Sequence, residues 1–216
     1  MTTESATPAE SGRLLIEIID IDGSLRPEVI EWVRTEVARR SSAPELGAVQ
    51  AWLGQSDDTG TLGADRSRVI LLHHPTGPTG GVDLTSQPQW LTQRHIYDGT
   101  AVSRRRAAGR PDPETAIGLR FVAMNCADGA EDEFHAWYEE DHLPKFTDVG
   151  GVLEGRRLHS PDSPRQHLAL YWLEDIKIVG IPEWKAAAGT DWTAQMRKKT
   201  FDRDRINLVP FPIDQA

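Results

Sequence analysis

The two halves of this 216-residue chain can be aligned on each other without a gap at their openings. A shift of 105 positions places Leu14 on Leu119, Glu28 on Glu133, Trp32 on Trp137 and Leu53 on Leu158. Few of the aligned residues are identical, so the repeat rests on the order of the expected elements and on the matching tryptophans. A repeated order of elements indicates one supersecondary unit used twice. We therefore predict two copies of a single folding unit.

The expected unit has the order β-α-β-β-α-β in both halves. Short apolar, β-branched runs and helical periodicity assign the elements. In the first half we expect strands at 13–20, 47–53, 68–73 and 101–107, with helices at 27–37 and 87–94. In the second half we expect strands at 119–125, 152–159, 167–173 and 205–211, with helices at 131–142, 182–188 and 191–199.

These elements predict an α+β fold of two tandem ferredoxin-like repeats. The boundaries are a disordered tail over 1–12, a first repeat over 13–108, a Pro- and Gly-containing linker over 109–116, and a second repeat over 117–216 that carries the site. Helices cover only one face of each four-stranded sheet, so the other face must be buried elsewhere. We expect the two sheets to pack on each other as an intrachain α/β barrel, with room for a small ligand between them.

Composition excludes several classes of function. The formal net charge of −9 disfavours nucleic-acid binding, which needs clustered cations to neutralise phosphates. No stretch approaches 18 apolar residues, so we expect no membrane span. A single cysteine, Cys126, suits a reducing compartment, and residues 1–12 lack the pattern of a signal peptide. We expect a cytoplasmic protein, and the sequence leaves open whether it is a monomer or a homodimer.

The segment from Asp132 to Arg157 carries a Phe-x-x-Trp-Tyr-x-x-x-His-x-Pro pattern. Its members are Phe134, Trp137, Tyr138, His142 and Pro144. This pattern resembles the dimeric α/β-barrel superfamily, with its closest similarity to the EthD-like branch. The resemblance covers about the last 100 residues. It implies the ferredoxin-like barrel and a pocket, and the superfamily includes cofactor-free isomerases, cyclases, lyases and monooxygenases as well as haem-binding proteins.

The helix expected at 131–142 carries the candidate catalytic histidine. Its aromatic residues Phe134, Trp137 and Tyr138 share one face and should pack on the sheet. His142 stands where Leu143 and Pro144 should end the helix. A helix C-terminus and the acidic neighbours favour a protonated imidazole, so we expect a raised pKa and a role in moving protons. Capping the helix is the alternative role.

Three further residues could act with His142. Asp141 could orient the imidazole. The strand at 152–159 must send either Arg156 or Arg157 inward, where the charge needs an acid such as Glu17 or Asp141, or an anionic ligand. Tyr171 on the next strand could place its hydroxyl in the same cavity. Solvent exposure of the arginine and simple core packing of Tyr171 are the alternatives.

Cofactor and metal signals are weak. His135, Glu139 and His142 share a helix face, but a metal site needs a fourth ligand at a recognisable spacing, so we expect none. Nucleotide-binding glycine motifs and the Gly-x-Ser-x-Gly elbow are absent from the sequence. These observations predict chemistry without a cofactor.

The sequence therefore predicts a cofactor-independent isomerase, cyclase or lyase acting on a small hydrophobic carbonyl or carboxylate compound. His142, Asp141, Arg156 and Tyr171 are the predicted catalytic residues, and Trp137, Tyr138, Trp184 and Trp192 are predicted to line the ligand pocket. Two alternatives remain open: a non-catalytic protein that binds a small ligand, and a haem-binding protein.

Overall fold

A computed structural model describes residues 12–55, 66–75 and 88–213. The strands in this part of the chain are β1 (Arg13–Asp22), β2 (Val49–Gln55), β3 (Arg66–His73), β4 (Leu91–Arg105), β5 (Gly118–Cys126), β6 (Val152–His159), β7 (His167–Leu173) and β8 (Thr200–Pro210). The helices are α1 (Pro27–Ser41), α2 (Glu131–Trp137), α3 (Leu143–Asp148), α4 (Pro182–Ala188) and α5 (Asp191–Met196). A π-helical turn, η3 (Tyr138–His142), joins α2 to α3, and short 3-10 turns lie at Pro44–Leu46, Pro113–Thr115 and Ile176–Gly180. Except for Gly12, the tail predicted to be disordered lies outside the described residues.

The strands form one closed antiparallel barrel in the order β1-β3-β2-β8-β5-β7-β6-β4. Each half contributes four adjacent strands in the same ferredoxin-like order, β4-β1-β3-β2 and β8-β5-β7-β6. The halves join through two strand pairs, β2 with β8 and β4 with β6. The α+β barrel built from both halves is therefore confirmed.

The barrel interior is an apolar core to which both halves contribute. Alternate residues of each strand point inward, as the pleat requires. The core includes Ile16, Trp52, Tyr97, Phe121 and Trp172, all at most 3% exposed. The middle of the barrel is therefore filled with side chains, in contrast to the ligand cavity that we expected between the two sheets.

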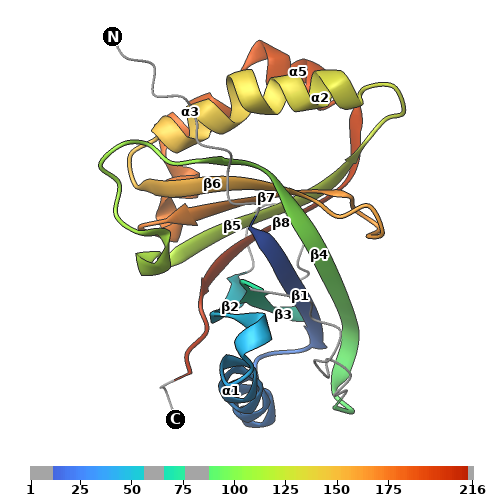
Figure 1. The fold of residues 1–216 in the computed structure, drawn as a ribbon, viewed down its shortest axis with the longest axis vertical. Helices are drawn as coiled ribbons and strands as arrows, with labels where there is room; N and C mark the ends of the chain where they lie inside the picture. The colour runs from blue at the N-terminus through green and yellow to red at the C-terminus, as the bar shows by residue number, and fades with distance from the viewer. Residues whose placement is uncertain (1–11, 56–65, 76–87, 214–216) are drawn as a thin grey trace.

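The helices cover the outer face of the barrel on opposite sides (Figure 1). Helix α1 lies against the first-half strands, whereas α2, α3 and α5 form a layer over the second half. Glycine at position 155 allows α3 to approach β6 closely, because a Cβ there would lie 2.7 Å from Leu143 Cδ1 and 3.0 Å from Thr147 Cγ2. The space between sheet and helices in the second half forms the candidate site.

Two predictions about secondary structure are wrong. Residues 91–94 belong to the long strand β4 rather than to a helix at 87–94, because β4 pairs along its length with β1 and then with β6. The helix expected to end at His142 continues through the π turn to Asp148. Pro144 is tolerated because it lies in the first turn of α3, where its missing N–H costs little.

Candidate functional site

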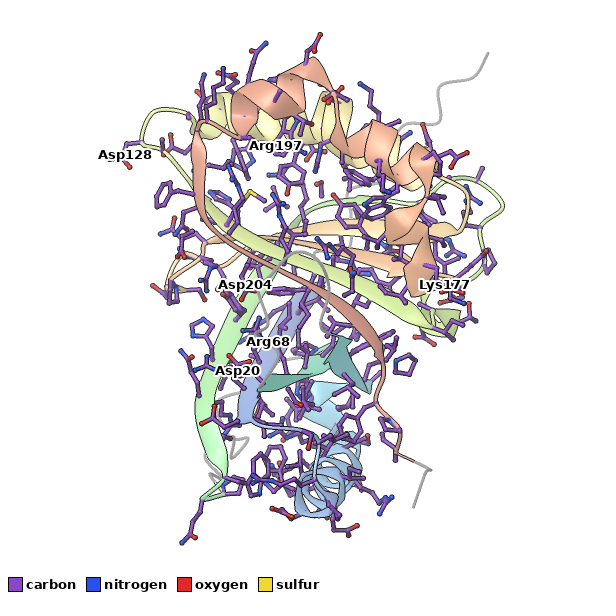
Figure 2. The ribbon with its side chains drawn as sticks, turned by 180° about the vertical axis from the view of Figure 1, so that it is seen from behind. Asp20, Arg68, Asp128, Lys177, Arg197 and Asp204 are labelled. Atoms are coloured by element: carbon purple, nitrogen blue, oxygen red, sulfur yellow. The ribbon has the colours of Figure 1, made fainter. Side chains whose placement is uncertain are left out.

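A cavity of about 100 Å³ lies between the outer face of the second-half sheet and its helical layer. We call it the His142 pocket. Its aromatic walls are Trp137, Tyr138, His142, Phe146, Tyr171 and Trp184. Its arginines are Arg120, Arg197, Arg203 and Arg205, and no carboxylate lines it. Figure 2 shows Arg197 beside the helical layer. Because Arg197 lines the pocket and is exposed, the pocket reaches the surface at this residue.

Strand alternation explains which residues reach this pocket. On β5, Phe121 points into the barrel core, whereas Arg120 and Val122 line the pocket. On β8, Arg203 and Arg205 face the pocket, whereas Ile206 packs in the core. The outer face of the sheet therefore supplies a cationic floor.

The π turn places His142 against the aromatic cluster. Its ring centroid lies 4.1 Å from that of Trp137 and 4.6 Å from that of Phe146. A π turn widens a helix by one residue and is often found at functional sites. Here it turns the imidazole toward the sheet while the helix continues.

A chain of hydroxyl groups connects His142 to Asp141. The Nδ1 of His142 lies 3.4 Å from the Thr193 Oγ1, which lies 2.8 Å from the Thr190 Oγ1. The Thr190 hydroxyl lies 2.7 Å from Asp141 Oδ2. The indole N–H of Trp137 also donates to Thr193, at 3.1 Å. Asp141 therefore reaches the imidazole through two threonines rather than by direct contact.

The number of protons available along this series of hydroxyl groups determines which nitrogen of His142 is protonated. The two threonine hydroxyls carry one proton each, yet three contacts join Asp141, Thr190, Thr193 and His142. All three contacts are hydrogen bonds only if His142 Nδ1 donates to Thr193, Thr193 donates to Thr190, and Thr190 donates to Asp141. In a neutral imidazole this arrangement leaves Nε2 unprotonated and able to accept.

The pKa of His142 is lowered to about 3. Burial is the largest cause; Asp141 raises the pKa, but Arg205, Arg197 and Arg157 lower it further. The raised pKa expected from a helix C-terminus and acidic neighbours is therefore wrong, because burial and the arginines outweigh Asp141 and because the helix continues past this residue. His142 is neutral near pH 7.

Tyr171 contributes a hydroxyl that has no partner in the described part of the structure. The side chain is only 2% exposed, and burial raises its pKa well above the usual value. A buried polar group without a hydrogen bond is costly and calls for an explanation. A ligand in the pocket would supply the missing partner.

The arginines of the pocket repel one another. Burial, then Arg203 and Arg197, lower the pKa of Arg205. Arg197 and Arg203 have no carboxylate partner among the described residues; Arg197 donates to the Ala188 carbonyl at 2.8 Å. Positive charge gathered around a partly apolar cavity favours an anionic ligand or an anionic intermediate.

The predicted site residues are only partly brought together. His142, Tyr171, Trp137, Tyr138 and Trp184 line the pocket. Asp141 is held by Lys145 and by Thr190 at the edge of the site. Trp192 packs at the margin of the same hydrophobic cluster but does not line the cavity.

Arg156 lies on the opposite face of the sheet. It packs over the Trp172 ring, which belongs to the barrel core, and donates to Glu154 at 2.6 Å. Arg157 points outward and pairs with Glu139 beneath the helix. The grouping of Arg156 with His142 is therefore not observed, because neighbouring residues on a strand face opposite sides.

Sequence reasoning missed Thr190, Thr193, Arg120, Arg203 and Arg205. The Thr-x-x-Thr spacing at 190–193 marks a helix N-cap, and Thr190 accepts from the Thr193 backbone N–H at 3.0 Å. The Arg-x-Arg spacing on β8 indicates two cations on one face. Both signals were present in the sequence, but only the fold shows that they converge.

No group of three or more His, Cys, Asp or Glu residues suited to a metal occurs within the described ranges. His135 lies 3.0 Å from Arg157 through its Nδ1, whereas His142 contacts Thr193, so the two histidines have separate environments. Among the described helices, none combines the length and apolarity needed to cross a bilayer.

Comparison with family models finds no match, and comparison with curated proteins finds none either. Several solved structures share the fold. An anthrone oxidase-like protein is 10% identical with a TM-score of 0.57, and the match covers 94% of this chain and 92% of that one. A mutant chlorite dismutase from Candidatus Nitrospira defluvii is 13% identical with a TM-score of 0.57, covering 94% and 93%.

A third similar structure is a ferredoxin-fold protein from Listeria monocytogenes related to antibiotic biosynthesis monooxygenases. It is 10% identical with a TM-score of 0.51, and the match covers 93% of this chain and 95% of that one. At such low identity the likeness extends to the fold and not to a reaction. The chain is thus an α+β protein with the ferredoxin-like barrel fold over nearly its whole length.

Proposed function

We propose that the chain is a cofactor-independent enzyme that moves a proton on a small hydrophobic carbonyl or carboxylate compound bound in the His142 pocket. The observation that carries this proposal is the combination of a neutral imidazole, an unpartnered Tyr171 hydroxyl and four arginines without a lining carboxylate. Such a cavity stabilises negative charge that develops during a reaction.

The proposed step begins with the lone pair of His142 Nε2. It takes a proton from the carbon beside the carbonyl and becomes an imidazolium. The electron pair of the broken C–H bond forms a carbon–carbon double bond, and the π pair of the carbonyl moves onto its oxygen, which gives an enolate. The guanidinium groups and the Tyr171 hydroxyl stabilise that oxygen. Return of the proton to another carbon gives an isomerase, and loss of a neighbouring leaving group gives a lyase.

The low pKa of His142 fits this step only when the pocket is occupied. In the empty pocket, burial and the arginines disfavour the imidazolium. A developing enolate adds a negative charge nearby, which favours the protonated imidazole and raises its pKa. The hydroxyl chain to Asp141 keeps Nδ1 protonated while Nε2 reacts, and it holds the ring orientation.

The described residues do not fit haem. The cavity of about 100 Å³ lies below the range of about 300–1,000 Å³ that is usual for ligand sites. The His142 ring is also packed against Trp137 and Phe146, which leaves no slot for a macrocycle. The cavity instead accommodates the reacting end of a small molecule, with the remainder extending past Arg197 toward the surface.

Deuterium exchange tests the proposal directly. Pyruvate and phenylpyruvate carry exchangeable protons beside a carbonyl, so ¹H NMR in D₂O measures their loss with and without the protein. We expect protein-dependent exchange that falls at least about 100-fold in His142→Gln. His135→Gln is the matched control, because His135 lies on the same helical segment outside the pocket.

Tryptophan fluorescence separates the rival functions. Saturable quenching by these compounds without protein-dependent exchange would favour the non-catalytic binding protein and contradict the enzyme. Exchange that persists in His142→Gln would remove the imidazole from the mechanism. Absence of both quenching and exchange would reject this class of ligand for the pocket.

A further inference from the structure

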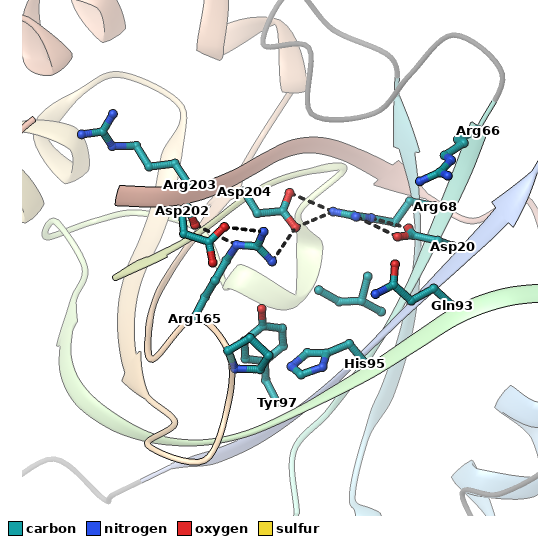
Figure 3. A pocket seen from close by; sticks show the side chains of 12 residues that line it. Asp20, Arg66, Arg68, Gln93, His95, Tyr97, Arg165, Asp202, Arg203 and Asp204 are labelled. Carbon is teal, nitrogen blue, oxygen red and sulfur yellow. Dashed lines mark hydrogen bonds and ion pairs between the residues drawn. The ribbon is translucent and has the colours of Figure 1, made fainter. Parts of the chain in front are cut away.

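A second and larger cavity, of about 560 Å³, lies at one mouth of the barrel. We call it the barrel-mouth cavity. Its walls come from β1, β3, β4, β8 and the turn between β6 and β7. The side chains used below are Asp20, Arg68, Gln93, Tyr97, Arg165, Asp202 and Asp204 (Figure 3). The volume falls within the usual range for a small-molecule site.

Inward alternation brings these residues to the mouth. Ile16 and Ile18 point into the barrel core, so Asp20, two residues farther along β1, continues the same face at its end. Arg68 continues the inward face of β3 beyond Ile70 in the same way. The apolar core therefore ends in a polar layer, which Figure 2 shows between the two halves.

An ion-pair network joins the two halves across this layer. Arg68 donates to Asp20 at 2.6 and 2.9 Å and to Asp204 at 2.8 and 2.9 Å. Burial opposes the charge of Arg68, but these two acids outweigh it and raise its pKa above the usual value. The network fixes the positions of both carboxylates before any ligand binds.

Arg165 holds the other side of the cavity. Its Nε donates to the Asp202 carbonyl at 2.7 Å, and its Nη2 donates to the Asp202 carboxylate at 2.9 Å. Asp202 has a φ of 50°, in the left-handed region that few residues other than glycine adopt. Backbone strain that is held in place by such contacts tends to occur at functional sites.

Apart from Arg203, the charged side chains that line the cavity are paired with opposite charges. Asp20 and Asp204 pair with Arg68, Asp202 pairs with Arg165, and Arg66 lies 3.7 Å from Asp22. In Figure 3 the Arg203 guanidinium points away from this network, and it donates to Thr200. A charged ligand would have to break a pair or remain uncompensated, which is unfavourable in a partly buried site.

Hydrogen-bonding capacity nevertheless remains. A carboxylate oxygen has two lone pairs, so Asp20 and Asp204 can each accept further bonds. The Tyr97 oxygen accepts from Arg165, which leaves its own proton to donate. Gln93 adds an amide that both donates and accepts. A hydroxyl group donates and accepts at one atom, so it suits this alternation of acceptors and donors.

From these observations we infer that the barrel-mouth cavity binds a neutral, polyhydroxylated molecule of monosaccharide size. The cavity shares only Arg203 with the lining of the His142 pocket, and its role goes beyond the proposed proton transfer. The aromatic pair of His95 and Tyr97, with centroids 4.3 Å apart, forms an apolar part of the wall against which a sugar ring can pack.

Saturation-transfer NMR and calorimetry on the full chain test this inference with compounds matched in shape. Glucose and myo-inositol are the neutral probes, while glucuronate and glucosamine add one negative or one positive charge to the same ring. We expect at least one neutral probe to bind at least about 10-fold more tightly than both charged ones, because each factor of ten corresponds to about 1.4 kcal/mol.

Variants locate the binding. Gln93→Ala and Tyr97→Phe should each weaken binding of the neutral probe about fivefold or more, because each removes a hydrogen-bonding group and leaves the ion pairs intact. Tyr171→Phe, the same change in the other pocket, should leave it unaltered. The inference is overturned if neither neutral probe binds, if a charged probe binds as tightly, or if both cavity variants bind normally.

Discussion

The two halves use the space between sheet and helix in different ways. In the first half, Arg40 is completely buried and forms an ion pair with Glu17. Its Nε lies 3.0 Å from Glu36 Oε2, and its Nη1 lies 3.3 Å from His73 Nε2. Arg94 lies 2.8 Å from Glu17. In the second half, the corresponding layer holds the His142 pocket. The 105-residue shift places Val37 opposite His142, so the first half lacks the imidazole.

The two halves therefore use the same architecture with different side chains in the layer between sheet and helix. In the first half, Arg39, Arg40 and Arg94 share the carboxylates of Glu17 and Glu36 in one ion-pair network. The buried His73 Nδ1 also lacks a hydrogen-bond partner among the described residues. The second half has arginines with no lining acid and a tyrosine hydroxyl with no partner in the described part of the chain. Groups left unmatched in the resting protein are the ones that a reacting molecule can satisfy.

Breaking the first-half cluster should give the largest change in stability. Arg40→Met removes a buried cation and leaves Glu17 with Arg94 alone and Glu36 with the part-exposed Arg39 alone, so the free energy of unfolding should fall by about 3–5 kcal/mol. Arg39→Met is the matched control on the same helix, because Arg39 is 42% exposed and its pair with Glu36 is worth less than about 1 kcal/mol. Urea denaturation measures both. If both variants lose the same free energy of unfolding, burial of the arginine does not determine the cost of removing it.

The pH dependence of stability should come from both halves. Burial lowers the pKa of His73 and of His142 to about 3, whereas the unfolded chain keeps values near 6.5. Between these values the unfolded chain binds more protons. The contribution is therefore complete above about pH 6.5 and is lost as the pH falls toward 3, at up to about 1.4 kcal/mol per pH unit for each histidine.

Replacing either histidine should reduce the slope of the free energy of unfolding against pH by the amount that corresponds to one proton. Urea denaturation from pH 7.5 to pH 4.5 gives the slope for the parent chain, for His73→Gln and for His142→Gln. If one variant keeps the parent slope, the corresponding ring is already protonated or exposed in the folded protein. A lowered histidine pKa would then contribute to stability only in the other half.

The hydroxyl chain of the second half should control the tautomer of His142. Thr193→Val leaves His142 Nδ1 and Trp137 Nε1 without their acceptor and should cost about 1–3 kcal/mol of stability. In ¹⁵N NMR, the pattern of a protonated Nδ1 and a free Nε2 should give way to a mixture. Thr193→Ser should restore the pattern. An unchanged spectrum in Thr193→Val would contradict the proton count.

Tyr171→Phe should have the smallest effect on stability and the opposite sign to Arg40→Met. Removing a buried hydroxyl without a partner should leave the free energy of unfolding unchanged or raise it by about 1 kcal/mol. Exchange of pyruvate protons should fall about tenfold or more if the hydroxyl stabilises the enolate. A clear loss of stability would mean that the hydroxyl has a structural partner.

The sequence predicts much of the barrel because its strands are marked by short apolar runs. The bounds expected for β6 and β7 agree with the structure. Only the end of β4 was expected, as a strand at 101–107, because Leu91–Arg105 is rich in polar residues and only its pairing with β1 and β6 reveals the alternation. Local pattern is weak where a strand owes its place to neighbours from both halves.

The site was predicted less completely than the fold. His142 and Tyr171 were found because imidazole and phenol are chemically distinctive. Arg156 points into the barrel, as one of the two expected alternatives, but it does not meet His142, because His142 lies under the helices on the outer face of the sheet. The pKa of His142 was expected in the wrong direction because the sequence does not reveal the burial of the ring, and because Pro144 suggested a helix end where the structure has a π turn.

Closure of the barrel within one polypeptide has a consequence for how such a protein can change. When two identical chains build a symmetric assembly, every substitution occurs twice, at both equivalent positions. Here the β2–β8 and β4–β6 seams join strands encoded separately. A substitution in one half leaves the equivalent residue of the other half unchanged. One half can therefore retain the residues that stabilise the barrel while the other half changes its side chains.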